Sequence, residues 1–243
     1  LQKGEGFNIV VPTGNFGNIL AGFYAKQMGI PIRRFVCASN QNNVLTDFIQ
    51  TGVYNRKRAF YTTTSPSMDI LISSNLERLL YHLYDGDTSA VSALMQQLAE
   101  TGRYEISDSA RQRLQKLFFG GFCNDDQTAA TIRKLFNNDG YLCDTHTAVA
   151  AKVFEDYRAQ TGDMTPAVIV STASPYKFAK SVLMAIDDDA KPQTEFEMTD
   201  RLAAVTKTTV PAALSDLKSR PVLHTACCDK TQMAAFIQQS LGL

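Results

Sequence analysis

One stretch decides the fold: residues 7–18, FNIVVPTGNFGN. Its first half is a short apolar run ended by Pro12, which is typical of a buried strand in a parallel sheet. Residues 19–28 follow with apolar side chains at helical spacing, and residues 33–38 form a second apolar run. A strand, a helix and a second strand within about thirty residues form a right-handed βαβ unit. This order predicts an α/β fold with a parallel sheet and flanking helices.

The residues after this unit predict further helices and then a return to α/β structure. Apolar positions recur at three- and four-residue steps in six segments: 44–50, 75–84, 89–100, 107–118, 128–137 and 146–160. The β-branched run 167–170 predicts another strand, Pro175 opens a helix, residues 187–197 read as an acidic linker, and 230–241 form a closing helix. We expect one domain over residues 1–243, with a mainly helical insertion at about 70–160.

Composition excludes several classes of protein. The 243 residues are 44% hydrophobic and 20% charged, as in ordinary globular proteins. Because 24 basic residues balance 24 acidic ones, we expect neither nucleic acid nor an anionic membrane as partner. No apolar run approaches the roughly 20 residues that span a bilayer. The five cysteines, an odd number without a CxxC pair, predict reduced thiols and a cytoplasmic protein.

The loop at residues 12–18 lies between the first predicted strand and the N-terminus of a helix. The first turn of a helix has unpaired N–H groups and about half a positive charge. Gly14 and Gly17 let the backbone curl and let an anion approach closely, so a phosphate fits without a lysine. A plain βα turn is the structural alternative. The GxGxxG dinucleotide fingerprint and the GK[ST] of the P-loop are both absent.

The segment VPTGNFGN at residues 11–18 resembles the phosphate loop of threonine synthases, which are fold-type II pyridoxal-phosphate enzymes. Four further blocks resemble the bacterial and fungal branch of that family in the expected order: ASNQNNVLTDF at 38–48, SPSMDILISSNLER at 65–78, GYLCDTHTAV at 140–149 and VSTASPYKF at 170–178. The resemblance implies a fold like that of the tryptophan synthase β-subunit. It also implies a lyase of threonine biosynthesis that converts O-phosphohomoserine and water to threonine and phosphate.

The resemblance assigns the phosphate of pyridoxal 5'-phosphate to the backbone of five loop residues: Gly14, Asn15, Phe16, Gly17 and Asn18. It assigns the pyridine nitrogen of the cofactor to Thr172. A neutral hydroxyl leaves that nitrogen largely unprotonated, which is how a protein tunes the cofactor's electronics. The structural alternative for Thr172 is a hydroxyl that caps the helix opened by Pro175.

The family's catalytic lysine, which forms a Schiff base with the cofactor, lies well upstream of the phosphate loop in an apolar-Lys-Asp context. Lys177, Lys180 and Lys230 lack that context and order, so we interpret them as solvated helix lysines. The sequence also begins at Leu1 rather than at Met. We therefore expect the C-terminal part of a threonine synthase without its catalytic lysine. Its partner would be the missing N-terminal part, and alone it would be inactive.

Other polar residues are weaker candidates, each with a structural alternative. For six of them, an active-site role and a structural role in turns or helix caps both remain open: Asn40, Asn42, Asn43, Ser65, Ser67 and Asp69. Asp144 or Thr145 is expected to cap a helix, with His146 near the active site as the less favoured hypothesis. The basic run 55–58 favours a solvated turn over a site for the substrate phosphate.

Two other functions remain open at this point. One is another fold-type II lyase, such as a serine/threonine dehydratase or a cysteine synthase. Those enzymes usually have a glycine-richer phosphate loop and lack the block at residues 65–70. The other is a non-catalytic phosphate-binding or regulatory module, which a single βα loop would permit.

Overall fold

The computed structural model describes residues 4–191 and 194–243 of the chain. It divides into two compact units, the first ending at Thr209 and the second spanning Val210–Leu243. The sequence pattern does not predict this boundary. Within the described segments, no helix combines the length and the apolar character needed to cross a membrane.

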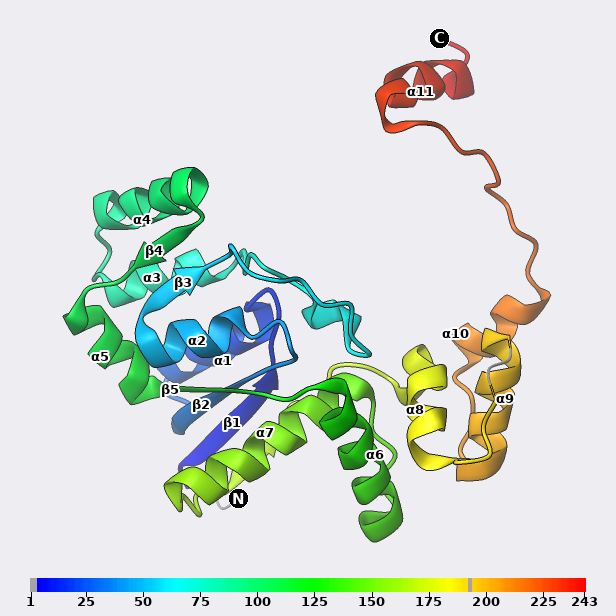
Figure 1. Ribbon diagram of the computed structural model, residues 1–243, viewed down its shortest axis with the longest axis horizontal. Coiled ribbons are helices and arrows are strands. Elements are labelled where there is room, and N and C mark those ends of the chain that lie inside the picture. Colours follow the sequence, from blue (N-terminus) through cyan, green and yellow to red (C-terminus); the bar gives the residue numbers. More distant parts are fainter. Residues whose placement is uncertain (1–3, 192–193) are drawn as a thin grey trace. The chain divides into compact units, whose positions relative to one another are not determined.

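A four-stranded parallel sheet lies at the centre of the first unit (Figure 1). Its strands are β1 (Phe7–Pro12), β2 (Ile32–Ser39), β5 (Phe118–Phe122) and β6 (Ala167–Ile169), in the order β5-β2-β1-β6. All three neighbouring pairs are parallel. The predicted α/β fold with a parallel sheet is confirmed, and β1 at the centre carries the loop of residues 12–18 at its carboxyl end.

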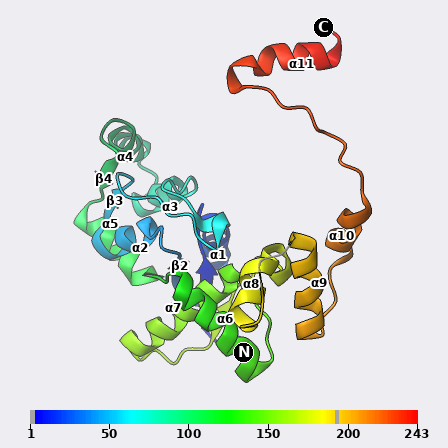
Figure 2. The same ribbon diagram turned by 45° about the vertical axis from the view of Figure 1, so that its right-hand side comes forward.

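Two hydrophobic clusters cover the two faces of this sheet, because successive strand residues point to opposite sides. On β2, Phe35 and Cys37 belong to the cluster that α1 (Gly17–Gln27) and α2 (Val44–Thr51) cover. Val36 and Ala38 belong to the other cluster, which α7 (Thr145–Thr161) covers. Figures 1 and 2 show α7 running along the sheet. Helices α1 and α7 lie on opposite faces of the sheet, and both begin at the edge where the parallel strands end.

Strand β5 is the one strand of the central sheet that the sequence pattern does not predict. The pattern predicts a helix over 107–118, but α5 ends earlier (Asp108–Leu117) and Phe118 begins a strand that pairs with β2. The reason is close packing of α2 on this strand. A Cβ at Gly120 would lie 3.0 Å from the Cα of Thr46, so a strand here needs glycine. Glycine weakens the β-propensity signal that would otherwise reveal the strand.

The helices between β2 and β6 match the predicted segments within a few residues. They are α2, α3 (Leu76–Leu83), α4 (Thr88–Thr101), α5, α6 (Asp125–Asp139) and α7. Two short strands, β3 (Val53–Asn55) and β4 (Arg103–Glu105), form a separate antiparallel pair, and η1 (Pro66–Met68) is a single 3₁₀ turn. Residues 70–160 are thus mainly helical, but they also supply β5 to the central sheet.

The remaining elements follow β6. They are η2 (Pro175–Phe178), α8 (Ala179–Ile186) and α9 (Glu195–Thr206) in the first unit, then α10 (Ala212–Ser215), η3 (Asp216–Ser219), η4 (Lys230–Gln232) and α11 (Met233–Leu241) in the second. Part of the expected linker 187–197 lies outside the described residues. The last three residues of the predicted linker, 195–197, instead form the first turn of α9. This helix begins with a capping box formed by Thr194 and Glu197.

The cysteines of the first unit behave as small hydrophobic residues. Cys37, Cys123 and Cys143 are buried free thiols. Burial raises the pKa of Cys37 and Cys143 to about 12 and that of Cys123 to about 11. Since the thiolate is the reactive form, these three side chains are chemically inert at neutral pH. Cys227 is exposed and Cys228 is half-buried, both in the second unit.

We predict that the unexpected strand β5 supports the core through Phe118. This side chain is 1% exposed and stacks on Phe35 with ring centroids 5.0 Å apart. Phe118→Ala should lower the free energy of unfolding by about 3–5 kcal/mol, because it leaves a cavity. Phe122→Ala in the same strand is the matched control, since that ring is 47% exposed, and it should cost less than about 1 kcal/mol. Urea denaturation followed by circular dichroism measures both, and equal losses would contradict the assignment of β5.

Candidate functional site

A pocket of about 300 Å³ opens at the edge of the sheet where β1 and β6 end. Its walls come from the loop at residues 12–18, from η1, from the start of α7 and from the segment after β6. The lining residues are Val11 to Ile19, Ser67, Met68, His146, Thr172, Ala173 and Lys177. The carboxyl edge of an open parallel sheet is where such folds bind ligands. The pocket unites all six residues that the resemblance singled out: Gly14, Asn15, Phe16, Gly17, Asn18 and Thr172.

The loop is held from behind through its carbonyl groups. Ser73 Oγ donates to the Gly14 carbonyl at 2.8 Å, and Asn75 Nδ2 donates to the Asn15 carbonyl at 2.7 Å. By contrast, no acceptor in the described segments receives a hydrogen bond from the N–H groups of residues 14–18. These donors stand at the N-terminus of α1, where the helix dipole is positive. The loop therefore has the chemistry of an anion site.

The two glycines of the loop serve different needs. A Cβ on Gly14 would lie 2.7 Å from the Ser67 carbonyl oxygen, so glycine is required for the close approach of η1. A Cβ on Gly17 would meet only Asn75 Nδ2, at 3.7 Å, so the space beside Gly17 is open. Free N–H groups with open space beside them fit a phosphate group of the size and charge that pyridoxal 5'-phosphate carries.

Phe16 differs from the other loop residues because its side chain is turned away into the core. It is 1% exposed, and its ring lies 5.9 Å from that of Phe118. Its φ of 64° is in the left-handed region, which is costly for a residue with a side chain. Only the backbone of Phe16 is available to a ligand, and the buried ring holds that backbone in its strained shape.

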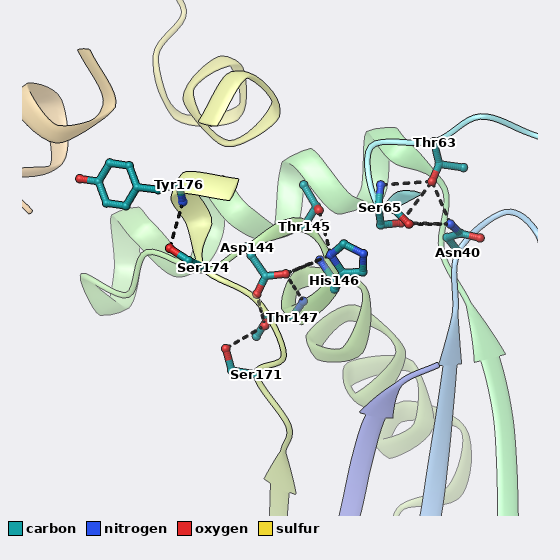
Figure 3. A network of polar contacts seen from close by, with 10 residues as sticks. All are labelled: Asn40, Thr63, Ser65, Asp144, Thr145, His146, Thr147, Ser171, Ser174 and Tyr176. Atoms are coloured by element: carbon teal, nitrogen blue, oxygen red, sulfur yellow. Dashed lines mark hydrogen bonds and ion pairs between the residues drawn. The ribbon is translucent and has the colours of Figure 1, made fainter. Parts of the chain in front are cut away.

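Thr172 follows β6 and is exposed to the pocket. The alternative role as a helix cap is wrong, because Ser174 fills it. The Ser174 hydroxyl accepts a hydrogen bond from the Tyr176 N–H at 3.3 Å, at the start of η2 (Figure 3). Thr172 lines the same pocket as the loop residues 14–18.

Asp144 caps α7, as expected of this position, while Thr145 lies inside the helix. Its buried carboxylate accepts from the backbone N–H of His146 at 2.8 Å and from Thr147 (Figure 3). Burial by itself would raise the pKa of Asp144, but the hydrogen bonds from His146 and Thr147 outweigh it and lower the pKa below the ordinary value. Asp144 is therefore a buried negative charge beside the pocket. His146, the less favoured hypothesis, lines the pocket.

The asparagines after β2 build a turn and do not line the pocket. Asn40 and Asn42 donate to the Asp69 carboxylate at 2.7 and 3.0 Å, which ties residues 61–69 to the end of the strand. Asn43 accepts from Arg58, which also pairs with Asp47 at 2.7 Å. The structure thus places Asn40, Asn42 and Asn43 in the structural role.

The segment that these asparagines hold contributes one wall of the pocket. Ser65 is buried and bonded to Asn40, and it supports the turn of η1. Ser67 and Met68, in η1 itself, line the pocket. The basic run 55–58 lies elsewhere, where Arg58 pairs with Asp47.

Lys177 is the residue whose position the sequence reasoning missed. It is exposed, as a solvated helix lysine is, yet it also lines the pocket. Its Nζ lies 5.4 Å from the centroid of the Phe178 ring. Lys180 is exposed outside the pocket, and Lys230 belongs to the second unit. Lys177 lies within η2, the 3₁₀ turn that follows Thr172, and this turn brings it to the pocket.

Comparison with known proteins agrees with this geometry. Residues 147–237 match the family model described as "Threonine synthase, C-terminal". The human protein "Threonine synthase-like 1" is 45% identical over 187 residues, covering 76% of this chain and 25% of that protein. Threonine synthase of Saccharomyces cerevisiae is 39% identical over 191 residues, covering 73% of this chain and 37% of the enzyme.

Solved structures give the same result. The "PLP bound Threonine synthase from Brucella melitensis" superposes with a TM-score of 0.75 at 39% identity, covering 89% of this chain and 42% of that one. Yeast threonine synthase gives a TM-score of 0.80 at 32% identity, covering 98% of this chain and 48% of that one. The chain spans a quarter to a half of the length of these relatives. In sequence and in fold, the chain belongs to the threonine synthase family.

Proposed function

We propose that residues 1–243 are the C-terminal portion of a threonine synthase and supply the phosphate side of its cofactor site. The whole enzyme would convert O-phosphohomoserine and water to threonine and phosphate, in threonine biosynthesis. One observation carries this proposal: free N–H groups at residues 14–18 and the hydroxyl of Thr172 line one pocket. Pyridoxal 5'-phosphate has a phosphate and a ring nitrogen that need these two kinds of partner.

The roles of the chain's own groups follow from their chemistry. The backbone of Gly14, Asn15, Phe16, Gly17 and Asn18 would bind the cofactor phosphate. The Thr172 hydroxyl would hydrogen-bond the ring nitrogen and, being neutral, leave it largely unprotonated. The cofactor, when bound, supplies the electron sink for chemistry at the substrate's carbon atoms. The chain would orient the cofactor and bind its negatively charged phosphate.

Partners and location complete the proposal. The catalytic lysine would come from the N-terminal part of the enzyme, which would complete the pocket, with O-phosphohomoserine as the small-molecule substrate. We assign the enzyme to the cytoplasm. The odd number of cysteines without a CxxC pair supports that assignment.

The first test compares pyridoxal 5'-phosphate with pyridoxal, which lacks only the phosphate. The full chain should bind the phosphorylated form at least about tenfold more tightly, because one hydrogen bond to a charged group contributes about 1.5–3 kcal/mol. Absorbance titration gives both dissociation constants. Equal affinities would show that the loop does not bind the phosphate.

A second prediction concerns Thr172. Thr172→Val replaces the hydroxyl by a methyl group of similar shape, so it should weaken binding of pyridoxal 5'-phosphate by about three- to tenfold, the loss of one neutral hydrogen bond. Thr172→Ser keeps the hydroxyl and is the matched control, with affinity close to that of the unchanged chain. The same titration measures all three proteins. A valine variant that binds as tightly as the serine variant would remove Thr172 from the site.

A third prediction concerns the lysines. The chain incubated with pyridoxal 5'-phosphate and then reduced with borohydride should carry no specific pyridoxyl label, and it should release no phosphate from O-phosphohomoserine. Lys177 is the sharpest check, because it lines the pocket. Peptide mapping by mass spectrometry should find Lys177 labelled no more than exposed Lys180. Stoichiometric label at Lys177, abolished in Lys177→Met, or turnover by the chain alone would contradict the assignment of the catalytic lysine to the N-terminal part.

A further inference from the structure

His146 lies in the wall of the pocket and has a buried nitrogen without a partner among the described residues. The residue is 3% exposed and lies in the first turn of α7. Its Nε2 is buried and has no hydrogen-bond partner among the described residues. It lines the same pocket of about 300 Å³ as residues 14–18. Buried polar atoms are nearly always paired, so an unpaired one in the wall of a pocket points to a ligand.

The ring of His146 is held in place from two sides. Its Nδ1 lies 3.2 Å from Oδ1 of Asp144, whose side chain is fully buried. The ring of Phe178 packs against it with centroids 4.8 Å apart. The same carboxylate also accepts a hydrogen bond from the Thr147 hydroxyl, which lies 3.1 Å from Ser171 Oγ, beside Thr172 (Figure 3). One network therefore positions His146 and the strand end that carries Thr172.

The Asp144 carboxylate decides which atoms of the ring carry protons. A carboxylate only accepts hydrogen bonds, so the hydrogen on Nδ1 points to Asp144. For Nε2 to donate to an anion, the ring must then carry hydrogen on both nitrogens.

A cation at this position would compensate part of the ligand's negative charge. A phosphate monoester carries about −1.5 to −2 charges at neutral pH, while a helix N-terminus offers about +0.5. The loop alone leaves most of the ligand's charge uncompensated. Lys177 is exposed to solvent, which weakens its effect, whereas His146 is buried.

We propose that His146 binds the phosphate of the pocket's ligand as an imidazolium, with Nε2–H donating to a phosphate oxygen and Nδ1–H donating to Asp144. This inference rests on the proposed function, since it takes the phosphate to lie at the loop. It adds a charged side chain to a site that the backbone alone was expected to form. The chemistry recognised is a phosphate group, whether of the cofactor or free in solution.

Nitrogen-15 NMR of the full chain, labelled at histidine, tests the proposal directly. Only His82, His146 and His224 contribute signals, and His146→Gln assigns the one of interest. At a pH of about 8, above the ordinary range of imidazole, we expect pyridoxal 5'-phosphate to turn both nitrogens of His146 into the N–H type. Inorganic phosphate should do the same at higher concentration, and pyridoxal should not. Bound pyridoxal 5'-phosphate with an unchanged His146 spectrum would overturn the proposal.

Affinity gives a second, independent measurement. His146→Leu should weaken binding of pyridoxal 5'-phosphate by about ten- to a hundredfold, the loss of a charge-assisted hydrogen bond, and leave pyridoxal binding unchanged. His146→Gln retains an N–H donor and should recover part of the loss. His82→Gln is the control, since His82 packs between Phe23 and Tyr24 at 5.3 and 5.4 Å, outside the pocket. A leucine variant that binds as tightly as the His82 control would also overturn the proposal.

The outcomes separate this inference from the proposed function. If the unchanged chain binds inorganic phosphate at His146 but not pyridoxal 5'-phosphate, the phosphate contact stands and the cofactor assignment fails. If it binds pyridoxal 5'-phosphate while His146 does not respond, the cofactor assignment stands and the contact fails. If neither ligand changes the His146 signals or binds at all, both are overturned.

Discussion

The site depends on a left-handed residue whose side chain is fixed in the core. Phe16 has a φ of 64°, and its ring packs against Phe118 on the edge strand of the sheet. That conformation lets the peptide groups of residues 14–18 turn their N–H groups to one side while Ser73 and Asn75 bind the carbonyl groups on the other. The energy of aromatic packing thus maintains a backbone shape that the loop alone would not keep. A strand distant in sequence therefore supports the anion site.

The parallel sheet brings the other half of the site to this loop. β1 and β6 are neighbours, and both end at the same edge, so the segment after β6 lies beside the loop after β1. Residues 14–18 and Thr172 are more than 150 positions apart in the chain and still line one pocket. The Asp144 network adds α7 to this edge and connects it to the segment that carries Thr172. Topology positions the groups, and hydrogen bonds orient them.

Several features of the fold and of the pocket can be predicted from short stretches of sequence. The loop between β1 and α1 and the Asp144 cap each follow from one short stretch of sequence. The features that sequence reasoning missed depend on tertiary packing. Gly120 belongs to a strand because α2 approaches it closely, and the Phe16 side chain leaves the site because a distant ring receives it. The orientation of His146 follows from a buried carboxylate and a stacked ring, which no spacing rule encodes.

The distribution of thiols has a practical consequence. Three cysteines of the first unit are buried and their ionisation is suppressed, whereas the adjacent pair at 227 and 228 belongs to the second unit, where Cys227 is exposed. A maleimide dye added to the folded protein will therefore attach to this pair and spare the sheet. The wild-type chain carries its own attachment point for a fluorophore or spin label, one that reports on the C-terminal segment without any engineered residue.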